Sequence, residues 1–420
     1  MTSKTSLDQL RLAEHLRAGD VIAWPQGPGE PIALTERLVS QRADLPPATL
    51  MVGLTASDTL RPELSDRFSF LALNGAGSTR RITALAEIVP CHVSTLPALI
   101  RSRTLRVDVA LIQVRPLPGG DYTVGVICDF TQAMIRQART VIALLNESLP
   151  LTREDAVVPA DDIDILVDGD HRIIDMPDPV PSAVEQAVAA HVASVIPDRA
   201  TVQLGVGTLP AAVAASLFNH KGLGVHSGVV SDVLVDLVER GVVTNAHKGR
   251  DSGLTVTGGL LGTRRLREFA ERSGTIAMRN VEYTHHMSVT STIHRFHTVN
   301  SAIEIDLSGQ VNSEVAGGRY LGAVGGQVDF VRAGLFSPEG HSIFAFPSTT
   351  PDGKQSRIVA TLGERPVTTA RSDVDIVITE YGISHLRGCS LRERARRLAG
   401  IAHPDHREGL LRAIADSRVE

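Results

Sequence analysis

The sequence is poor in residues that would place it in several large classes of protein. It has three cysteines in 420 residues, Cys91, Cys128 and Cys389. Their spacing matches neither a disulfide framework nor a zinc-binding pattern, so reduced thiols are expected. Aromatic residues make up only 4% of the chain, which leaves Val, Ile, Leu and Ala to fill the core. Such cores are typical of parallel sheets covered by helices.

Long apolar runs and concentrated positive charge are also missing. No run of about 18 apolar residues occurs, so no membrane span is expected. The first residues, MTSKTSLDQLRLAEHLRAGD, lack the apolar centre of a signal peptide, which predicts a cytoplasmic protein. The net charge is −5, and the basic segments 264–272 and 387–397 contain interleaved glutamates. We interpret them as solvated helix faces with i,i+4 pairs and expect no nucleic-acid partner.

Short apolar segments alternate with helical patterns along most of the chain. Strands separated by helices predict βαβ units, hence an α/β fold with a mostly parallel sheet. The proline-rich segment 174–182 predicts a boundary near residue 180, between domains 1–180 and 181–420. Ser182 and Glu185 have the spacing of a capping box for a helix over 183–195. The expected strands are Val21–Trp24, Val107–Val114, Val124–Ile127, Val141–Leu145, Val202–Leu204, Ile343–Phe346 and Ile376–Thr379.

A faint internal repeat relates the two halves. Each contains a strand, a turn rich in glycine or proline and the start of a helix. The first unit begins near Val21 with its helix over 32–40, and the second begins near Thr201 with its helix over 211–218. Two similar domains facing each other would place a cleft between these turns.

Two glycine-rich turns could contact a ligand. The second unit's turn contains Gly205, Val206, Gly207 and Thr208, followed by Pro210 in a first helical turn. Free N–H groups there could hold a phosphate or an oxyanion, although a packing turn would have the same pattern. It is not the G-x-G-x-x-G fingerprint of dinucleotide-binding proteins. The other turn contains Gly322, Gly325 and Gly326.

The segment before the second glycine turn alternates between apolar and polar residues. Ile303, Ile305 and Leu307 alternate with Glu304 and Asp306, which predicts a half-buried strand with both carboxylates on its solvent face.

The order of motifs resembles acetyl-CoA hydrolases and 4-hydroxybutyrate CoA-transferases over nearly the whole chain. The C-terminal motifs are SAIEIDLSGQVNSE, GAVGGQVDFVRAG, FPSTTPDGKQSRIV, VDIVITEYGISHLRG, SLRERARRL and IAHPDHRE, with VQLGVGTLPAAVAASL and LGVHSGVVSD before them. The resemblance implies two related α/β domains with the coenzyme A site between them. It further implies an acyl-CoA substrate, an acceptor acid, water or another nucleophile, a homodimer and no metal. The glycine turns and Lys354 are the implied coenzyme A contacts.

The sequence departs from this family at the reacting position. In the family, a glutamate attacks the thioester, forms an acyl-glutamyl anhydride and then a glutamyl-CoA thioester. That glutamate follows a His/Tyr-Ser pair, and here the matching segment is His226-Ser227-Gly228. Glycine has no side chain, so the anhydride route cannot start from position 228.

Two further departures lie nearby in the family pattern. Family members carry an asparagine beside a proline step before the SAxE strand, where this chain has Tyr283-Thr284-His285-His286-Met287. His285 or His286 therefore replaces that asparagine. After the PST motif a small residue and lysine usually follow, but here Thr350-Pro351 intervenes and Lys354 is the nearest lysine.

Three explanations for the missing glutamate remain open. A histidine could activate water or another acceptor, with His226, His285, His286, His294 and His297 as candidates, or Glu304 or Glu314 could replace the nucleophile. The chain could instead be a silent coenzyme A-binding protein or partner subunit. Histidines 285–297 could also form a metal site, which their spacing does not favour.

Three other residues raise smaller questions. Cys128 is predicted to be a core residue on a buried strand. Ser227 is adjacent to His226, and neighbouring residues rarely face each other, so no Ser/His pair is expected. Trp24 could line a pocket or cover the core.

Overall fold

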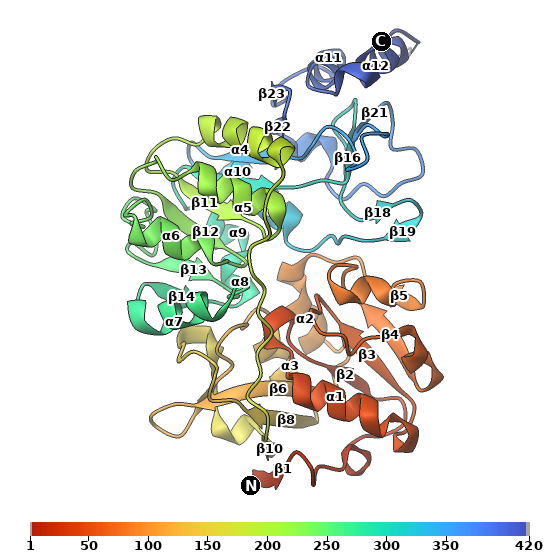
Figure 1. Ribbon diagram of the computed structural model, residues 1–420, viewed down its shortest axis with the longest axis vertical. Helices are drawn as coiled ribbons and strands as arrows, with labels where there is room; N and C mark the ends of the chain where they lie inside the picture. The colour runs from red at the N-terminus through yellow and green to blue at the C-terminus, as the bar shows by residue number, and fades with distance from the viewer. Residues whose placement is uncertain (1, 417–420) are drawn as a thin grey trace.

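The computed structural model describes residues 2–416 and consists of two α/β units, one for each half of the chain (Figure 1). The sheet of the first unit has its eight main strands parallel, in the order β1-β10-β8-β6-β2-β3-β4-β5. Their bounds are β1 Ser3–Ser6, β2 Val21–Ala23, β3 Ala48–Val52, β4 Phe68–Ala72, β5 Ala86–Ile88, β6 Val109–Pro116, β8 Thr140–Leu145 and β10 Ile165–Asp168. Helices α1 Ile32–Gln41, α2 Leu96–Arg101 and α3 Thr131–Gln137 accompany it, and β7 Tyr122–Thr123 and β9 Val157–Val158 extend it antiparallel.

The sheet of the second unit has the order β14-β13-β12-β11-β15-β20-β22-β23, and only β23 is antiparallel. Its strands are β11 Thr201–Leu204, β12 Gly224–Ser227, β13 Thr255–Thr257, β14 Ile276–Met278, β15 Phe296–Asn300, β20 His341–Ala345, β22 Ile376–Thr379 and β23 Gly382–His385. Its helices are α4 Ala183–Val195, α5 Thr208–Ser216, α6 Val233–Glu239, α7 Arg264–Ser273, α8 Val281–Thr284, α9 Met287–Thr290, α10 Gln327–Phe336, α11 Leu391–Gly400 and α12 Pro404–Asp416.

The two sheets share one topology. In the first, β2 lies in the middle, β3, β4 and β5 follow outward on one side, and β6, β8 and β10 on the other. In the second, β11 has β12, β13 and β14 on one side and β15, β20 and β22 on the other. The repeat predicted from strands starting near Val21 and Thr201 is confirmed, because these are the two central strands.

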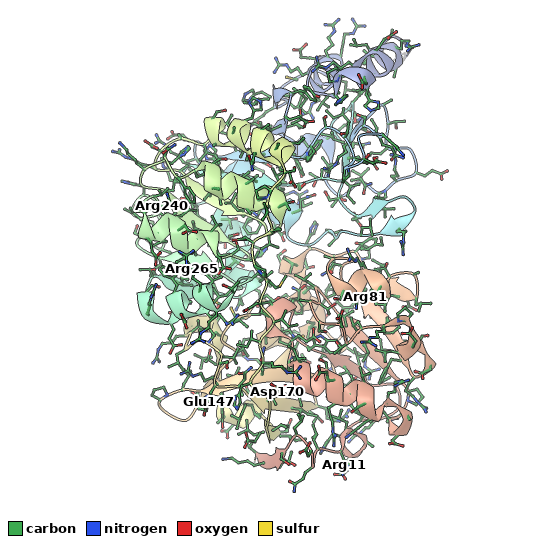
Figure 2. All side chains as sticks on the ribbon, viewed as in Figure 1. Arg11, Arg81, Glu147, Asp170, Arg240 and Arg265 are labelled. Carbon is green, nitrogen blue, oxygen red and sulfur yellow. The ribbon has the colours of Figure 1, made fainter. Side chains whose placement is uncertain are left out.

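A segment without helix or strand connects the two sheets. Residues 169–182 contain neither helix nor strand, and Figure 1 shows this segment running along the front of the molecule from β10 to α4. The predicted capping box is confirmed: Glu185 N donates to Ser182 Oγ at 3.2 Å, and Ser182 N donates to the Glu185 carboxylate at 2.8 Å. The basic segments lie in α7 and in and just before α11, with the expected i,i+4 pairs Arg264–Glu268 and Glu393–Arg397. Figure 2 labels Arg265, one of the exposed arginines of α7.

Two local predictions are wrong. Val124–Ile127 is not a strand, because Gly125 has a φ of +67° and the chain turns there to pair with Gly259 of the second unit. The carboxylates of β16 (Glu304–Asp306) are buried rather than on a solvent face. This strand lies in a small sheet between β17 (Val311–Asn312) and β21 (Ile358–Val359), next to the hairpin β18 Val315–Ala316 and β19 Arg319–Tyr320. All three of its residues are buried, so neither face is open to solvent.

Apolar side chains fill both faces of each sheet. Trp24 belongs to a cluster with Ile22, Leu34 and Leu50 under the first sheet, so it covers the core and lines no pocket described below. Among the described residues, no helix is both long and apolar enough to cross a lipid bilayer.

Candidate active site

A cavity of about 390 Å³ lies between the two sheets, at the carboxyl ends of their parallel strands. From the first unit, Gln26 follows β2, Leu54 follows β3, and Asn74 follows β4. From the second, Gly205 follows β11 and Gly228 follows β12. Ligands of open α/β sheets bind at this end, next to the central strand where the chain reverses its order of crossing. The cavity therefore has the expected position of a ligand site in both units at once.

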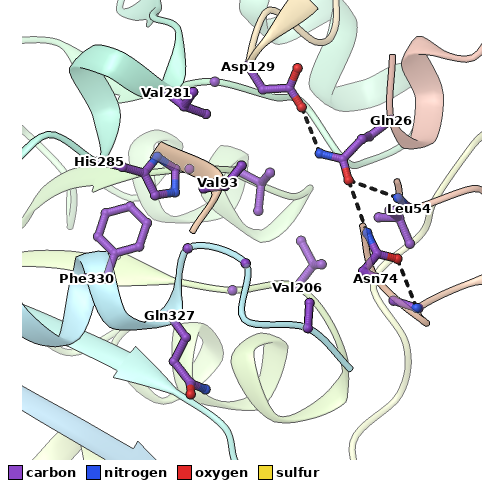
Figure 3. A pocket seen from close by; sticks show the side chains of 18 of the residues that line it. Gln26, Leu54, Asn74, Val93, Asp129, Val206, Val281, His285, Gln327 and Phe330 are labelled. Atoms are coloured by element: carbon purple, nitrogen blue, oxygen red, sulfur yellow. Dashed lines mark hydrogen bonds between the residues drawn. The ribbon is translucent and has the colours of Figure 1, made fainter. Parts of the chain in front are cut away.

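The imidazole of His285 fills the space beside Gly228. A Cβ atom at position 228 would lie 2.8 Å from His285 Cε1 and 3.0 Å from Nε2. A Cβ atom at position 326 would lie 2.5 Å from the same Nε2. The ring is thus held between two glycines, with the Phe330 ring 4.4 Å away between centroids (Figure 3). Neither glycine can gain a side chain unless His285 moves.

Burial keeps His285 uncharged. Desolvation lowers its pKa to about 3, so the imidazole is neutral at physiological pH. Its Nδ1 lies 2.8 Å from Thr284 Oγ1, which leaves Nε2 beside the cavity. The Thr284 hydroxyl could also donate to the carbonyl of Asn280 at 3.1 Å, but that carbonyl already accepts two backbone N–H groups at 3.0 Å. The tautomer with the ring proton on Nε2 requires the hydroxyl to donate to Nδ1 in place of the Asn280 carbonyl.

A chain of amides and a carboxylate lines the wall from the first unit. Gln26 Nε2 donates to Asp129 Oδ2 at 2.8 Å, and Gln26 Oε1 accepts from Leu54 N at 2.9 Å and Asn74 Nδ2 at 3.3 Å (Figure 3). Asn74 Oδ1 in turn accepts from Ala76 N. Both amide side chains are therefore fixed in orientation, and Asp129 is the carboxylate of this cavity.

Two amides on the opposite wall have atoms without a partner in the protein. Gln203 Oε1, in β11, and Asn300 Nδ2, at the end of β15, are buried and make no hydrogen bond to any described residue. Both residues line the cavity. Unpartnered buried polar groups are costly, so these atoms are suited to bind a polar part of a ligand.

The glycine turns predicted from the sequence only partly reach the cavity. The cavity is lined by His285 and by five residues of the turns, Gly205, Val206, Gly322, Gly325 and Gly326. Gly207 and Thr208 do not. Gly207 has a φ of +122° and precedes α5, and the Thr208 hydroxyl donates to Glu185 instead.

The other histidines lie elsewhere. His226 is buried behind Gly228, its Nε2 lies 2.9 Å from the Thr284 carbonyl, and burial lowers its pKa to about 3. His286 is exposed and its Nδ1 lies 2.7 Å from Ser288 Oγ. His294 pairs with Glu339 at 3.1 Å, and His297 lies in β15. Among the described residues, no three His, Cys, Asp or Glu side chains are grouped to hold a metal ion.

The predicted carboxylates and Lys354 also lie outside this cavity. Glu304 accepts from Asn312 at 2.7 Å and pairs with Arg365. Glu314 accepts from Thr368 Oγ1 at 2.7 Å and Tyr320 OH at 3.2 Å, and its carbonyl accepts Gly322 N at 3.0 Å, which anchors the second glycine turn. Lys354 lies in an exposed turn.

Ser227 and Cys128 have structural surroundings. Ser227 Oγ donates to the Leu204 carbonyl at 2.8 Å rather than to His226, as expected for adjacent residues. Cys128 is buried, and desolvation raises its pKa well above the ordinary value, so its thiol is inert.

Sequence reasoning missed Gln26, Asn74, Asp129, Gln203 and Asn300. Each lies in or just after a strand, or just before a helix, at the end of the sheet where α/β proteins bind ligands. That position was the available signal for Gln26, which follows β2, and for Gln203, which lies in β11. For Asp129 it was misleading, because the predicted strand Val124–Ile127 does not form and contacts with distant residues position this carboxylate.

The shared topology and the cavity define an α/β protein of two related units with a candidate ligand site between them. The family model of the acetyl-CoA hydrolase/transferase N-terminal domain matches residues 6–177, and the family model of the C-terminal domain matches residues 262–414. The chain belongs to the acetyl-CoA hydrolase/transferase family, as its motifs suggested.

Individual relatives agree with this assignment. The 4-hydroxybutyrate coenzyme A transferase of Clostridium kluyveri is 37% identical over 396 residues, which cover 93% of this chain and 92% of the relative. The succinyl-CoA:cyclohexane-1-carboxylate CoA transferase of Geobacter metallireducens is 32% identical over 408 residues, covering 95% and 92%. The structure of RipA from Yersinia pestis matches with a TM-score of 0.92 at 30% identity, covering 98% of this chain and 97% of RipA.

Proposed function

We propose that this protein hydrolyses an acyl-CoA thioester bound in the cavity between its two sheets, without forming a glutamyl intermediate. The observation that carries the proposal is the imidazole of His285 beside Gly228, where a Cβ atom would lie 2.8 Å from the ring. The names of the relatives support the substrate class, since they act on coenzyme A thioesters.

His285 is suited to polarise the thioester carbonyl. A histidine with a pKa of about 3 is a poor proton acceptor at neutral pH, but a neutral imidazole is a competent hydrogen-bond donor. With the Thr284 hydroxyl proton on Nδ1, the Nε2–H group can donate to the carbonyl oxygen as negative charge develops there. A donor held in a dry site costs no reorganisation when the charge appears, which is the basis of oxyanion stabilisation.

The absence of a carboxylate at position 228 favours water as the acceptor. Transfer through a glutamyl thioester keeps the coenzyme A bound to the protein while the two acids exchange. Position 228 provides no atom to hold it, whereas hydrolysis needs only the thioester and water. One relative with the name acetyl-CoA hydrolase, from Kluyveromyces lactis, is 27% identical over 277 residues.

The test is a panel of acyl-CoA thioesters, including acetyl-, butyryl-, succinyl- and 4-hydroxybutyryl-CoA. Thiol release in water and transfer of coenzyme A to acetate are measured in parallel. We expect thiol release that does not depend on acetate. Transfer that exceeds hydrolysis for every thioester would contradict the proposal.

The second candidate is a silent coenzyme A-binding protein, which the same glycine favours. It predicts coenzyme A binding by calorimetry without turnover of any thioester. Because His285 blocks position 228, Gly228→Glu alone is not an informative variant. The double variant Gly228→Glu/His285→Ala opens the space, and transfer activity appearing only in the double variant, with an inactive wild type, would identify a silenced enzyme.

A further inference from the structure

The proposed hydrolysis lacks a proton acceptor, and Asp129 is placed to be one. A water molecule that attacks the thioester must lose a proton, and neutral His285 is a weak base. Among the described residues that line the cavity, Asp129 is the only carboxylate. It stands just before α3 on the wall of the first unit, across the cavity from Phe330 and Gln327 (Figure 3).

Three hydrogen bonds fix the carboxylate. Oδ1 accepts from Phe130 N at 2.6 Å and from Thr131 Oγ1 at 3.2 Å, and Oδ2 accepts from Gln26 Nε2 at 2.8 Å. Gln26 is itself fixed by Leu54 N and Asn74. A carboxylate held this way presents its remaining lone pairs in one orientation, as a catalytic base requires.

Backbone hydrogen bonds tie Asp129 to both reacting positions of the other unit. Cys128 N donates to the Gly258 carbonyl at 2.9 Å, and Gly258 N donates to the Gly228 carbonyl at 3.0 Å. Val281 N donates to the Asp129 carbonyl at 3.0 Å, and His285 N donates to the Val281 carbonyl at 3.1 Å. A continuous series of backbone hydrogen bonds therefore connects the segments of Asp129, Gly228 and His285, which are far apart in the sequence.

Asp129 also borders a second cavity. This cavity, of about 280 Å³, is lined by Asp129 and Phe130 together with polar residues such as Gln132 and Asn280. The two cavities share Asp129 and Phe130 as lining residues. The charged groups that line it are Arg101, Arg136, Glu154, Asp155 and Glu282.

We infer that Asp129 is the catalytic base of the proposed hydrolysis. Asp129 removes a proton from water, the water oxygen bonds to the thioester carbon, and the carbonyl oxygen takes up negative charge beside His285. As the carbonyl re-forms, the C–S bond breaks and the coenzyme A thiolate receives the proton from Asp129. The products are the free acid and coenzyme A thiol, and no other reactant is required.

The electrostatic surroundings agree with this role. Burial raises the pKa of Asp129, although hydrogen bonds from Gln26, Phe130 and Thr131 oppose the shift. A carboxylate with a raised pKa is a stronger base than one on the surface. The adjacent Cys128 thiol is neutral because burial raises its pKa too, so it adds no charge beside the carboxylate.

The first test compares Asp129→Asn with Asp329→Asn. Asp329 is a matched control, since burial raises its pKa and it accepts from Ser94 Oγ at 2.9 Å, but it does not line the cavity. We expect Asp129→Asn to lower kcat by about 10²- to 10⁴-fold with KM nearly unchanged, and Asp329→Asn to keep kcat within about threefold. An Asp129→Asn variant with the kcat of the wild type overturns the inference.

The second test does not require Asp129→Asn to fold. The acidic limb of kcat/KM in the wild type should report the Asp129 carboxyl, at a pH above the ordinary pKa of aspartate. Replacing Gln26 by Met removes a hydrogen bond that stabilises the ionised form, so the limb should move to higher pH. A limb that stays in place overturns the inference.

The inference rests on the proposed function, and the two fail differently. If the wild type hydrolyses no thioester, both are wrong. If the wild type is active and Asp129→Asn is equally active, only the role of Asp129 is wrong and the proposed hydrolysis stands.

Discussion

At the scale of single residues, the proposed hydrolysis depends on His285. Its ring lies between Gly228 and Gly326, and its surroundings keep it neutral. The sequence left His285 and His286 as equivalent candidates. Only the structure separates them, since one ring borders the cavity and its neighbour faces solvent.

Replacing His285 should therefore affect turnover far more than replacing His286. We expect His285→Ala to lower kcat by about 10²- to 10³-fold, the usual effect of removing one donor to a developing oxyanion. His285→Gln keeps an N–H donor and should retain more activity, while His286→Ala should stay close to the wild type. Steady-state kinetics with the best thioester of the panel measures this. Equal losses in the two alanine variants would show that His285 has no special role.

The pH profile gives a separate check on the same residue. Because burial lowers the pKa of His285 to about 3, its protonation should cause no inflection of kcat/KM near the ordinary histidine value of 6.5. An inflection near 6.5 that disappears in His285→Ala would contradict the neutral role.

The contact between the ring and Gly326 should also be visible in stability. A Cβ atom at position 326 would lie 2.5 Å from His285 Nε2, so Gly326→Ala is expected to lower the free energy of unfolding by about 1–3 kcal/mol. In the His285→Ala background, Gly326→Ala should lower the free energy of unfolding much less. The difference is a coupling energy between the two positions of about 0.5–3 kcal/mol. Urea unfolding of the wild type, the two single variants and the double variant measures this double-mutant cycle. Additive effects would contradict the packing of the ring against the glycine.

At the scale of elements, the loop Gly322–Gly326 connects the small sheets of the second unit to the cavity. Gly322 N and Leu321 N both donate to the Glu314 carbonyl. A Cβ atom at position 322 would overlap the Ser313 carbonyl oxygen. The turn can therefore approach the cavity only with glycine at this position.

Gly322→Ala should displace this loop. We expect a higher KM for acyl-CoA together with a lower melting temperature, because the loop must move away from Ser313. Gly409→Ala, in α12, is the control, since a Cβ atom there would meet no neighbour within 4 Å. Unchanged KM and stability in Gly322→Ala would show that the loop adapts without affecting the site.

Local patterns predicted most elements but not the arrangement of the site. The capping box at Ser182, the central strands and the basic helices were all readable because each depends on residues close in the sequence. Val124–Ile127 had the apolar composition of a strand, yet its conformation depends on Gly125 and on pairing with the distant Gly259. Asp129 was missed for the same reason, since the distant Gln26 holds its carboxylate and Val281 of the other unit binds its carbonyl.

At the scale of the whole molecule, buried neutral histidines connect folding to pH. Desolvation lowers the pKa of His226 and His285 to about 3 and that of His297 to about 4. In the unfolded chain these groups take up protons below about pH 6.5. Because the unfolded state then binds more protons at these three positions than the folded state, these histidines lower the stability as the pH falls.

This coupling predicts acid lability between about pH 6.5 and pH 4. Each of the three histidines should lower the free energy of unfolding by up to about 1.4 kcal/mol for every pH unit below 6.5. Urea midpoints measured at several pH values give the slope, and His297→Gln should make it shallower by up to one third. The same slope in the variant would show that His297 is not buried as a neutral group.

The packing of His285 between two glycines also has a consequence for how this sequence can change. A glutamate at position 228 and the ring at position 285 compete for one volume, so each substitution is tolerated only in a background where the other group is absent. A change to glutamate at position 228 would have to pass through a protein with neither group, which has lost the imidazole and not yet gained a carboxylate. Ancestral and laboratory-evolved sequences should therefore rarely carry Glu and His together at these two positions.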